Sequence, residues 1–172
     1  SSAGIIIIGD EILSGRTKDT NINWIANELD EIGIQLKEAR VIEDDKKTII
    51  NTVLEFSKKF TYVFTSGGIG PTHDDVTTES IAAAFKVDLE KNKIAMNLLK
   101  KHYEKSNIDF NEARQKMAII PKGALLIDNP VSVAPGFNIK NVYVFAGVPK
   151  IMQSMFNSCL LYTSPSPRDQ VV

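Results

Sequence analysis

The sequence predicts an α/β protein, a three-layer α/β/α sandwich built around a mostly parallel central sheet. Short apolar runs alternate with stretches in which apolar residues recur at helical spacing. The first five predicted elements follow in the order strand, helix, strand, helix, strand. Such alternation is typical of a parallel sheet whose right-handed crossovers place helices on both faces.

The first half of the chain supplies these five elements. Residues 3 to 8 form a continuous apolar run, the pattern of a strand buried on both faces, and residues 34 to 42 and 60 to 65 predict two further strands. Residues 22 to 29 and 49 to 56 carry apolar residues at helical spacing. The alternation therefore predicts that these three strands are parallel neighbours in one sheet.

The second half is less regular. Helices are expected at 76 to 85, 91 to 104 and 111 to 117, then strands at 124 to 127, 130 to 137 and 141 to 145, and a last helix that begins near Pro149. We expect the domain to span residues 1 to 157. The polar, proline-rich end predicts that residues 158 to 172 are a tail outside the domain, native or artefactual.

Composition excludes several classes of protein. The 172 residues are 43% apolar and carry 20 basic against 21 acidic side chains, a balance that disfavours a nucleic-acid partner. The single cysteine, Cys159, excludes an internal disulfide, and with only two histidines any metal would be held by oxygen. No apolar run approaches the ~20 residues of a membrane helix. We expect a cytoplasmic protein that does not bind membranes.

The stretch from Thr65 to Asp75 is the strongest local signal for function. Three glycines, Gly67, Gly68 and Gly70, follow the third predicted strand, and a helical pattern opens after them. Glycine lets the backbone approach a ligand closely with its N–H groups turned inward, and a helix N-terminus adds positive potential. The pattern predicts a phosphate-binding turn.

The acidic pair Asp74-Asp75 adds a cation to this prediction. Two carboxylates would repel a bare phosphate, so the pattern indicates a phosphate bridged by Mg²⁺ or another divalent cation. The alternative is a structural turn in which Asp75 only caps a helix that starts near Val76. The loop matches neither the P-loop nor the dinucleotide fingerprint G-x-G-x-x-G.

Acidic residues follow each of the first three predicted strands. The turns are Asp10-Glu11, Asp44-Asp45 and Asp74-Asp75. Because open α/β sheets bind ligands at the carboxyl ends of their strands, these turns would converge on one crevice with the glycine loop. Each pair could equally be a helix cap.

Four ordered motifs resemble the molybdopterin-binding MoaB/Mog domain, and the nearer match is its CinA-like branch. They are GDEILSG at 9–15 followed by Thr20-Asn21, TSGGIGPTHDDVT at 65–77, NPVSVAPGF at 129–137 and AGVPKIM at 146–152. The resemblance implies a ligand site made of Gly9, Ser14, Gly15, Asn21, Ser66, Gly67, Gly68, Gly70, Pro71, Thr72, Ser132, Pro135, Gly136, Gly147 and Pro149. Val133 stands where the bacterial CinA pattern usually has threonine.

The resemblance also implies an activity. Mog-type members adenylate molybdopterin with ATP and Mg²⁺, whereas CinA-like members are linked to cleavage of pyrophosphates such as ADP-ribose or FAD. The family's catalytic acidic positions correspond to Asp44 and Asp75, and we assign Asp10 and Asp75 to the cation. The C-terminal deamidase domain of full CinA proteins has no counterpart among these residues, so deamidation is not expected of them.

Three hypotheses follow. The first is a divalent-metal-dependent nucleotide pyrophosphatase with molybdopterin or an adenine nucleotide as its ligand. The second is an adenylyltransferase of molybdenum cofactor biosynthesis, which needs the same cation and phosphate contacts. The third is a non-catalytic binding module. A homo-oligomer, dimer or trimer, is expected from family habit.

Overall fold

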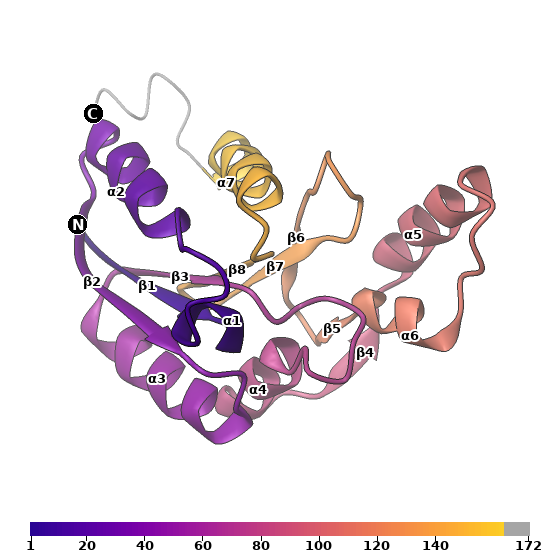
Figure 1. Ribbon diagram of the computed structural model, residues 1–172, viewed down its shortest axis with the longest axis horizontal. Helices are drawn as coiled ribbons and strands as arrows, with labels where there is room; N and C mark the ends of the chain where they lie inside the picture. Colours follow the sequence, from indigo (N-terminus) through magenta and orange to yellow (C-terminus); the bar gives the residue numbers. More distant parts are fainter. Residues whose placement is uncertain (164–172) are drawn as a thin grey trace.

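The structure is a computed structural model that describes residues 1–163. Its centre is a six-stranded sheet in the order β2-β1-β3-β8-β7-β6 (Figure 1). The strands are β1 Ser2–Ile8, β2 Gln35–Ile42, β3 Tyr62–Ser66, β6 Leu125–Ile127, β7 Gly136–Ile139 and β8 Val142–Phe145. The first four strands of the sheet order are parallel, and β7 runs antiparallel to both of its neighbours. The predicted mostly parallel sheet is confirmed.

Helices cover both faces of this sheet. Helices α2 and α7 lie on one face, and α3 and α4 lie on the other (Figure 1). Their bounds are α2 Asn21–Glu31, α3 Lys46–Lys59, α4 Thr77–Ala84 and α7 Pro149–Thr163. The three-layer architecture is confirmed.

Strand β1 explains why its sequence is apolar without interruption. Ile6 and Ile8 belong to the core beneath α3 and α4, whereas Ile5 and Ile7 belong to the core beneath α2 and α7. Successive side chains of a strand point to opposite faces, and here both faces are covered. The two covered faces therefore explain the unbroken apolar run of β1.

Acidic caps start two of the helices. Asp19 accepts hydrogen bonds from the backbone N–H groups of Asn21 at 3.2 Å and Ile22 at 3.0 Å, and Asp45 accepts one from Thr48 at 3.0 Å. The structural interpretation of the acidic turns is thus correct for Asp45. It is wrong for Asp75, because α4 starts after Val76 and receives no side-chain cap.

The strand expected at 130 to 137 is shorter than predicted. Strand β7 starts only at Gly136, because Asn129 folds the preceding residues into a turn. Its Oδ1 accepts the N–H groups of Val131 and Ser132, and its Nδ2 donates to the Ala134 carbonyl at 2.9 Å. These bonds take the place of the backbone hydrogen bonds to a neighbouring strand that a β-strand would need.

Residues 89–121 form an excursion from the sandwich that we call the α5 lobe (Figure 1). It contains β4 Leu89–Lys91, α5 Lys93–Lys105, α6 Glu112–Gln115, the 3-10 helix η1 Lys116–Ala118 and β5 Ile119–Pro121. The two predicted helices are present. The sequence did not predict β4 and β5, which pair antiparallel and are too short to show a period. A small core of Ala95, Leu99 and Ala118 supports the lobe.

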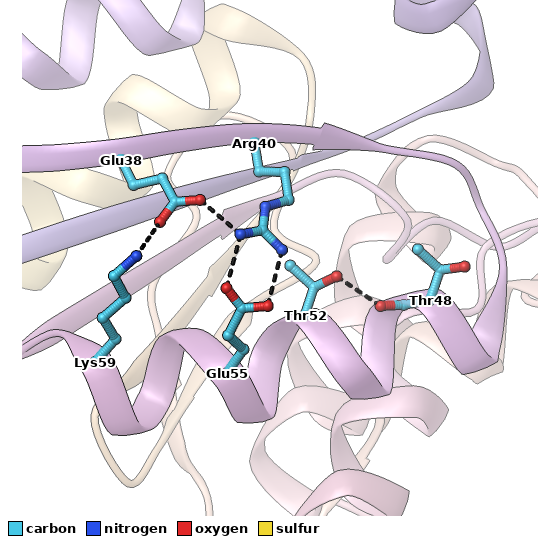
Figure 2. A network of polar contacts seen from close by, with 6 residues as sticks. All are labelled: Glu38, Arg40, Thr48, Thr52, Glu55 and Lys59. Carbon is cyan, nitrogen blue, oxygen red and sulfur yellow. Dashed lines mark hydrogen bonds and ion pairs between the residues drawn. The ribbon is translucent and has the colours of Figure 1, made fainter.

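Charged residues tie the edge strand β2 to α3. The Arg40 guanidinium donates to both carboxylate oxygens of Glu55, at 3.0 and 2.7 Å, and to Glu38 at 2.6 Å (Figure 2). Lys59 donates to the other oxygen of Glu38 at 2.9 Å. The Lys59 and Arg40 bonds hold the pKa of Glu38 below its ordinary value. Charges on an edge strand also oppose pairing with another sheet.

Helix α7 continues past residue 157, the predicted end of the domain, and is described as far as Thr163. The rest of the expected tail lies outside the described residues. Within residues 1–163, no helix is both long and apolar enough to cross a membrane.

Candidate functional site

A pocket of about 480 Å³ lies at the carboxyl edge of the parallel strands. Its walls come from the ends of β1 and β3, the loop before α2, the glycine loop after β3 and the start of α7. This is the edge at which open α/β sheets bind ligands. The glycine-rich turn, Asp75 and Glu11 line this cavity, whereas the acidic turn after β2 does not.

Asn21 is a buried residue of this pocket, with 3% of its surface exposed. Its Nδ2 donates to Ser66 Oγ and to the Gly147 carbonyl, both at 2.9 Å. The carbonyl can only accept, so it fixes which end of the amide faces it. The Asn21 Oδ1 atom is left without a hydrogen-bond partner among the described residues. A buried unpaired acceptor costs about 1–3 kcal/mol, so a small movement that lets Oδ1 receive a donor from a ligand or water would be favourable.

The glycine loop has a backbone that only glycine adopts comfortably. Gly67 has φ 107° and Gly68 has φ 76°. A Cβ on Gly67 would overlap the Ile8 carbonyl oxygen, and one on Gly68 would overlap Thr77 Oγ1. Thr77 Oγ1 donates to the Gly67 carbonyl at 2.9 Å and its N–H donates to the Gly68 carbonyl at 3.0 Å. These contacts attach the loop to the start of α4.

The same loop offers unused hydrogen-bond donors. Across the described part of the chain, no acceptor receives the backbone N–H groups of Gly68, Ile69 or Gly70, and all three residues line the pocket. Helix α7 begins at Pro149, and Pro149 and Ile151 of its first turn line the pocket. Proline has no N–H, but the other N–H groups of a first helical turn, such as that of Ile151, have no partner within the helix. The pocket therefore combines two sources of anion-binding donors.

Asp75 is the predicted catalytic residue that lines the pocket. Its Oδ2 accepts hydrogen bonds from the Thr72 N–H at 2.9 Å and from Thr72 Oγ1 at 2.8 Å. No group in the described residues donates to its Oδ1, which leaves that oxygen able to bind a ligand or a cation.

Asp10 and Asp44, which follow β1 and β2, are hydrogen-bonded to each other. The Asp10 N–H donates to Asp44 Oδ2 at 3.1 Å, and the Asp44 N–H donates to Asp10 Oδ1 at 3.0 Å. Neither residue lines the pocket. Burial raises the pKa of the Asp44 carboxyl against the opposing effect of the Asp10 N–H, and the charges of Asp10, Glu11 and Asp75 raise it further.

The described residues contain no group of three or more His, Cys, Asp or Glu side chains arranged to hold a metal ion. Mg²⁺ usually binds through one or two carboxylates together with substrate phosphates. The free Oδ1 of Asp75 beside the donors of the glycine loop fits that mode.

The structure divides the predicted ligand residues into two groups. Those that line the pocket are Asn21, Ser66, Gly67, Gly68, Gly70, Ser132, Gly147 and Pro149. Those that do not line it are Gly9, Ser14, Gly15, Pro71, Thr72, Pro135 and Gly136. Of the second group, Pro135 lines a smaller neighbouring cavity of about 210 Å³, which shares Asp75 with the main pocket.

The comparisons with known proteins agree with the observed fold. Residues 4–167 match the family model described as "Probable molybdopterin binding domain". The crystal structure of CinA from Thermoplasma acidophilum, a protein of unknown function, is 34% identical, with a TM-score of 0.86 and 100% of both chains covered. This chain is a CinA-like member of the molybdopterin-binding MoaB/Mog domain family.

More distant structures share the fold alone. The molybdopterin biosynthesis enzyme MoaB from Thermus thermophilus is 15% identical, with a TM-score of 0.63, 98% of this chain and 93% of that chain covered. Among sequences, a protein from Sulfurisphaera tokodaii is 39% identical over 91% of this chain, and one from Metallosphaera sedula is 35% identical over 92%. The chain spans only 61% and 62% of the length of these two relatives.

Sequence reasoning missed several pocket residues of this MoaB/Mog domain. Asp19 precedes the start of α2 and had a recognisable signal, since aspartate is a preferred cap just before a helix. Asn129 also had one, because Asn-Pro is a turn dipeptide. Lys18 and Met117 carry no comparable local pattern, whereas Glu11 lies in one of the acidic turns that the sequence placed at this edge.

Replacing Asp44 and replacing its neighbour Asp45 by asparagine should change the free energy of unfolding in opposite directions. The raised pKa of Asp44 means that stability is lost as pH rises through its folded pKa, so Asp44→Asn should be more stable than the wild type at pH 7. The Thr48 N–H and hydroxyl lower the pKa of Asp45. The stability that the Asp45 carboxylate contributes to the fold is therefore lost as pH falls, and Asp45→Asn should be less stable than the wild type at pH 7. In urea denaturation the Asp44→Asn difference should shrink as pH falls towards the ordinary aspartate pKa of 3.8, whereas the Asp45→Asn difference should shrink mainly below it. The same sign for both variants would contradict this electrostatic account.

Proposed function

We propose that this domain is a divalent-cation-dependent nucleotide pyrophosphatase that acts on dinucleotides such as ADP-ribose or FAD. The observation that supports the proposal is the position of the Asp75 carboxylate in a pocket beside the unused N–H groups of Gly68, Ile69 and Gly70. Donors and a carboxylate side by side suit a phosphate group carrying a cation. Asn21 Oδ1, the unpartnered acceptor, suits a ligand that also carries an N–H or O–H donor.

The chain's own residues then take distinct roles. The loop N–H groups bind phosphate oxygens, and Asp75 Oδ1 would hold a Mg²⁺ ion, which would neutralise charge on the phosphates. Asp44 takes no part in this step because it does not line the pocket, and the attacking water releases its proton to solvent. Water oxygen bonds to phosphorus while the bond from phosphorus to the bridging oxygen breaks. ADP-ribose thereby gives AMP and ribose 5-phosphate.

The test is a turnover measurement on the purified protein with ADP-ribose, with and without Mg²⁺. The wild type should release AMP only when the cation is present. Asp75→Asn should lower the rate by about 100-fold, since charge stabilisation in the transition state is lost while the side chain keeps its shape. Asp88→Asn is the matched control, because Asp88 is exposed and does not line the pocket. It should keep the wild-type rate.

Other outcomes would replace the proposal. Unchanged turnover in Asp75→Asn would remove Asp75 from the mechanism. An adenylated pterin, formed from molybdopterin and ATP, would assign the domain to adenylyl transfer. Saturable binding that survives EDTA and yields no product would make it a binding module. Sedimentation of the same sample measures the homo-oligomer that the family resemblance predicts.

A further inference from the structure

Lys116 of the α5 lobe reaches the loop that carries Asp75. Its Nζ donates to the Thr72 carbonyl at 2.5 Å and to the Asp75 carbonyl at 2.6 Å. The two acceptors lie 44 and 41 residues before Lys116 in the chain. Lys116 is half-buried and opens η1, the short helix that follows α6. One ammonium group thus joins the lobe to the edge of the pocket.

The loop between these acceptors is a closed turn. Asp75 Oδ2 accepts from the N–H and the hydroxyl of Thr72, and the Asp75 N–H donates back to the Thr72 carbonyl at 3.1 Å. Lys116 therefore binds the two carbonyls at the ends of a turn whose internal bonds set the orientation of the Asp75 carboxylate. Residues 73 and 74, between them, are exposed and contribute little packing.

The lobe has further contact with the site. Met117, next to Lys116, lines both the main pocket and the smaller cavity beside it, and Asp75 lines both as well. Lys116 lines the smaller cavity. The lobe therefore meets the site at the residue assigned to the cation, and Met117 also packs against the lobe's own core of Ala95, Leu99 and Ala118.

We infer that Lys116 is a positioning residue that clamps the 72–75 turn and so holds the Asp75 carboxylate in the orientation that the reaction requires. This inference rests on the proposed function for its catalytic half. Its structural half, the clamp itself, stands on the two carbonyl bonds. A lysine ammonium is a donor only, and two backbone carbonyls satisfy two of its three protons.

The experiment compares Lys116→Met, which keeps the length of the side chain and removes every donor, with Lys116→Arg, which keeps the charge and the donors. Lys122→Met is the control, because Lys122 is an exposed lysine of the loop that follows β5. Lys116→Met should lower kcat for ADP-ribose about 10-fold with KM changed less than about twofold, since misplacing a reacting group slows the chemical step more than binding. Lys116→Arg should recover most of kcat.

Amide hydrogen exchange gives a readout that does not depend on turnover. The N–H groups of Thr72, Asp75 and Thr77 are hydrogen-bonded within the turn and its attachment to Gly68. In Lys116→Met they should exchange faster, while those of β1 and α3 keep the wild-type rate, and Lys116→Arg should restore the protection.

The outcomes separate the inference from the proposed function. Unchanged exchange at residues 72–77 in Lys116→Met would overturn the clamp. Faster exchange with wild-type kcat would overturn the positioning role. If the wild type releases no AMP, the proposed function fails, and faster exchange in Lys116→Met would still support the clamp on this turn.

Discussion

A Gly67→Ala variant is expected to lose about 3 kcal/mol or more of the free energy of unfolding. Gly67 has φ 107°, a backbone conformation that costs an L-residue about 1–3 kcal/mol. The new Cβ would also overlap the Ile8 carbonyl oxygen, which belongs to the central strand and cannot move without disturbing the sheet. For a domain of this size the loss corresponds to a fall in Tm of about 10 °C.

The control for this prediction is Gly123→Ala. Gly123 has φ 84°, so it carries similar backbone strain, but a Cβ there would meet no atom within 4 Å. The difference in Tm between the two variants therefore isolates the overlap with Ile8. Equal losses in thermal unfolding would show that the overlap contributes nothing and that strain alone makes glycine necessary after β3.

The sandwich could be predicted because its elements depend on local periodicity. The isoleucine run of β1 and the apolar stripes of α2 and α3 indicate which faces of these elements are buried. The short strands β4 and β5 could not be predicted, because three residues show no period. The predicted strand from Pro130 failed for another reason: the Asn129 side chain takes over the backbone hydrogen bonds of the residues that follow it.

The site was predictable where it follows a strand and unpredictable where it depends on tertiary contacts. The glycine loop has a strong local pattern and lines the pocket. By contrast, Asp10 and Asp44 hydrogen-bond to one another across a separation of 34 residues and do not line the pocket, which no single-sequence pattern reports. Lys116 is a charged residue of a charged segment, and only the fold brings it to Asp75.

Asn21→Ala is expected to weaken binding of AMP or ADP-ribose by about 10- to 100-fold, the loss of one buried hydrogen bond to a ligand donor. The reason is the Oδ1 atom of Asn21, which has no hydrogen-bond partner in the part of the chain that the structure describes. Asn21 lines the pocket and is only 3% exposed. The wild type leaves this acceptor unsatisfied without a ligand, so a donor that fills it gains more than it would at the surface. Titration calorimetry measures the change in Kd.

Two variants distinguish a direct contact from a disturbed pocket. Ser66→Ala removes one acceptor of the Asn21 amide and leaves Oδ1 in place, so it should weaken binding by less than Asn21→Ala does. Asn23→Ala, an exposed residue of the same helix, should leave Kd unchanged. If Asn21→Ala folds and binds AMP as tightly as the wild type, Oδ1 receives no donor from the ligand. If Ser66→Ala costs as much as Asn21→Ala, the effect comes from the orientation of the amide and the start of α2, because the two variants share only that bond.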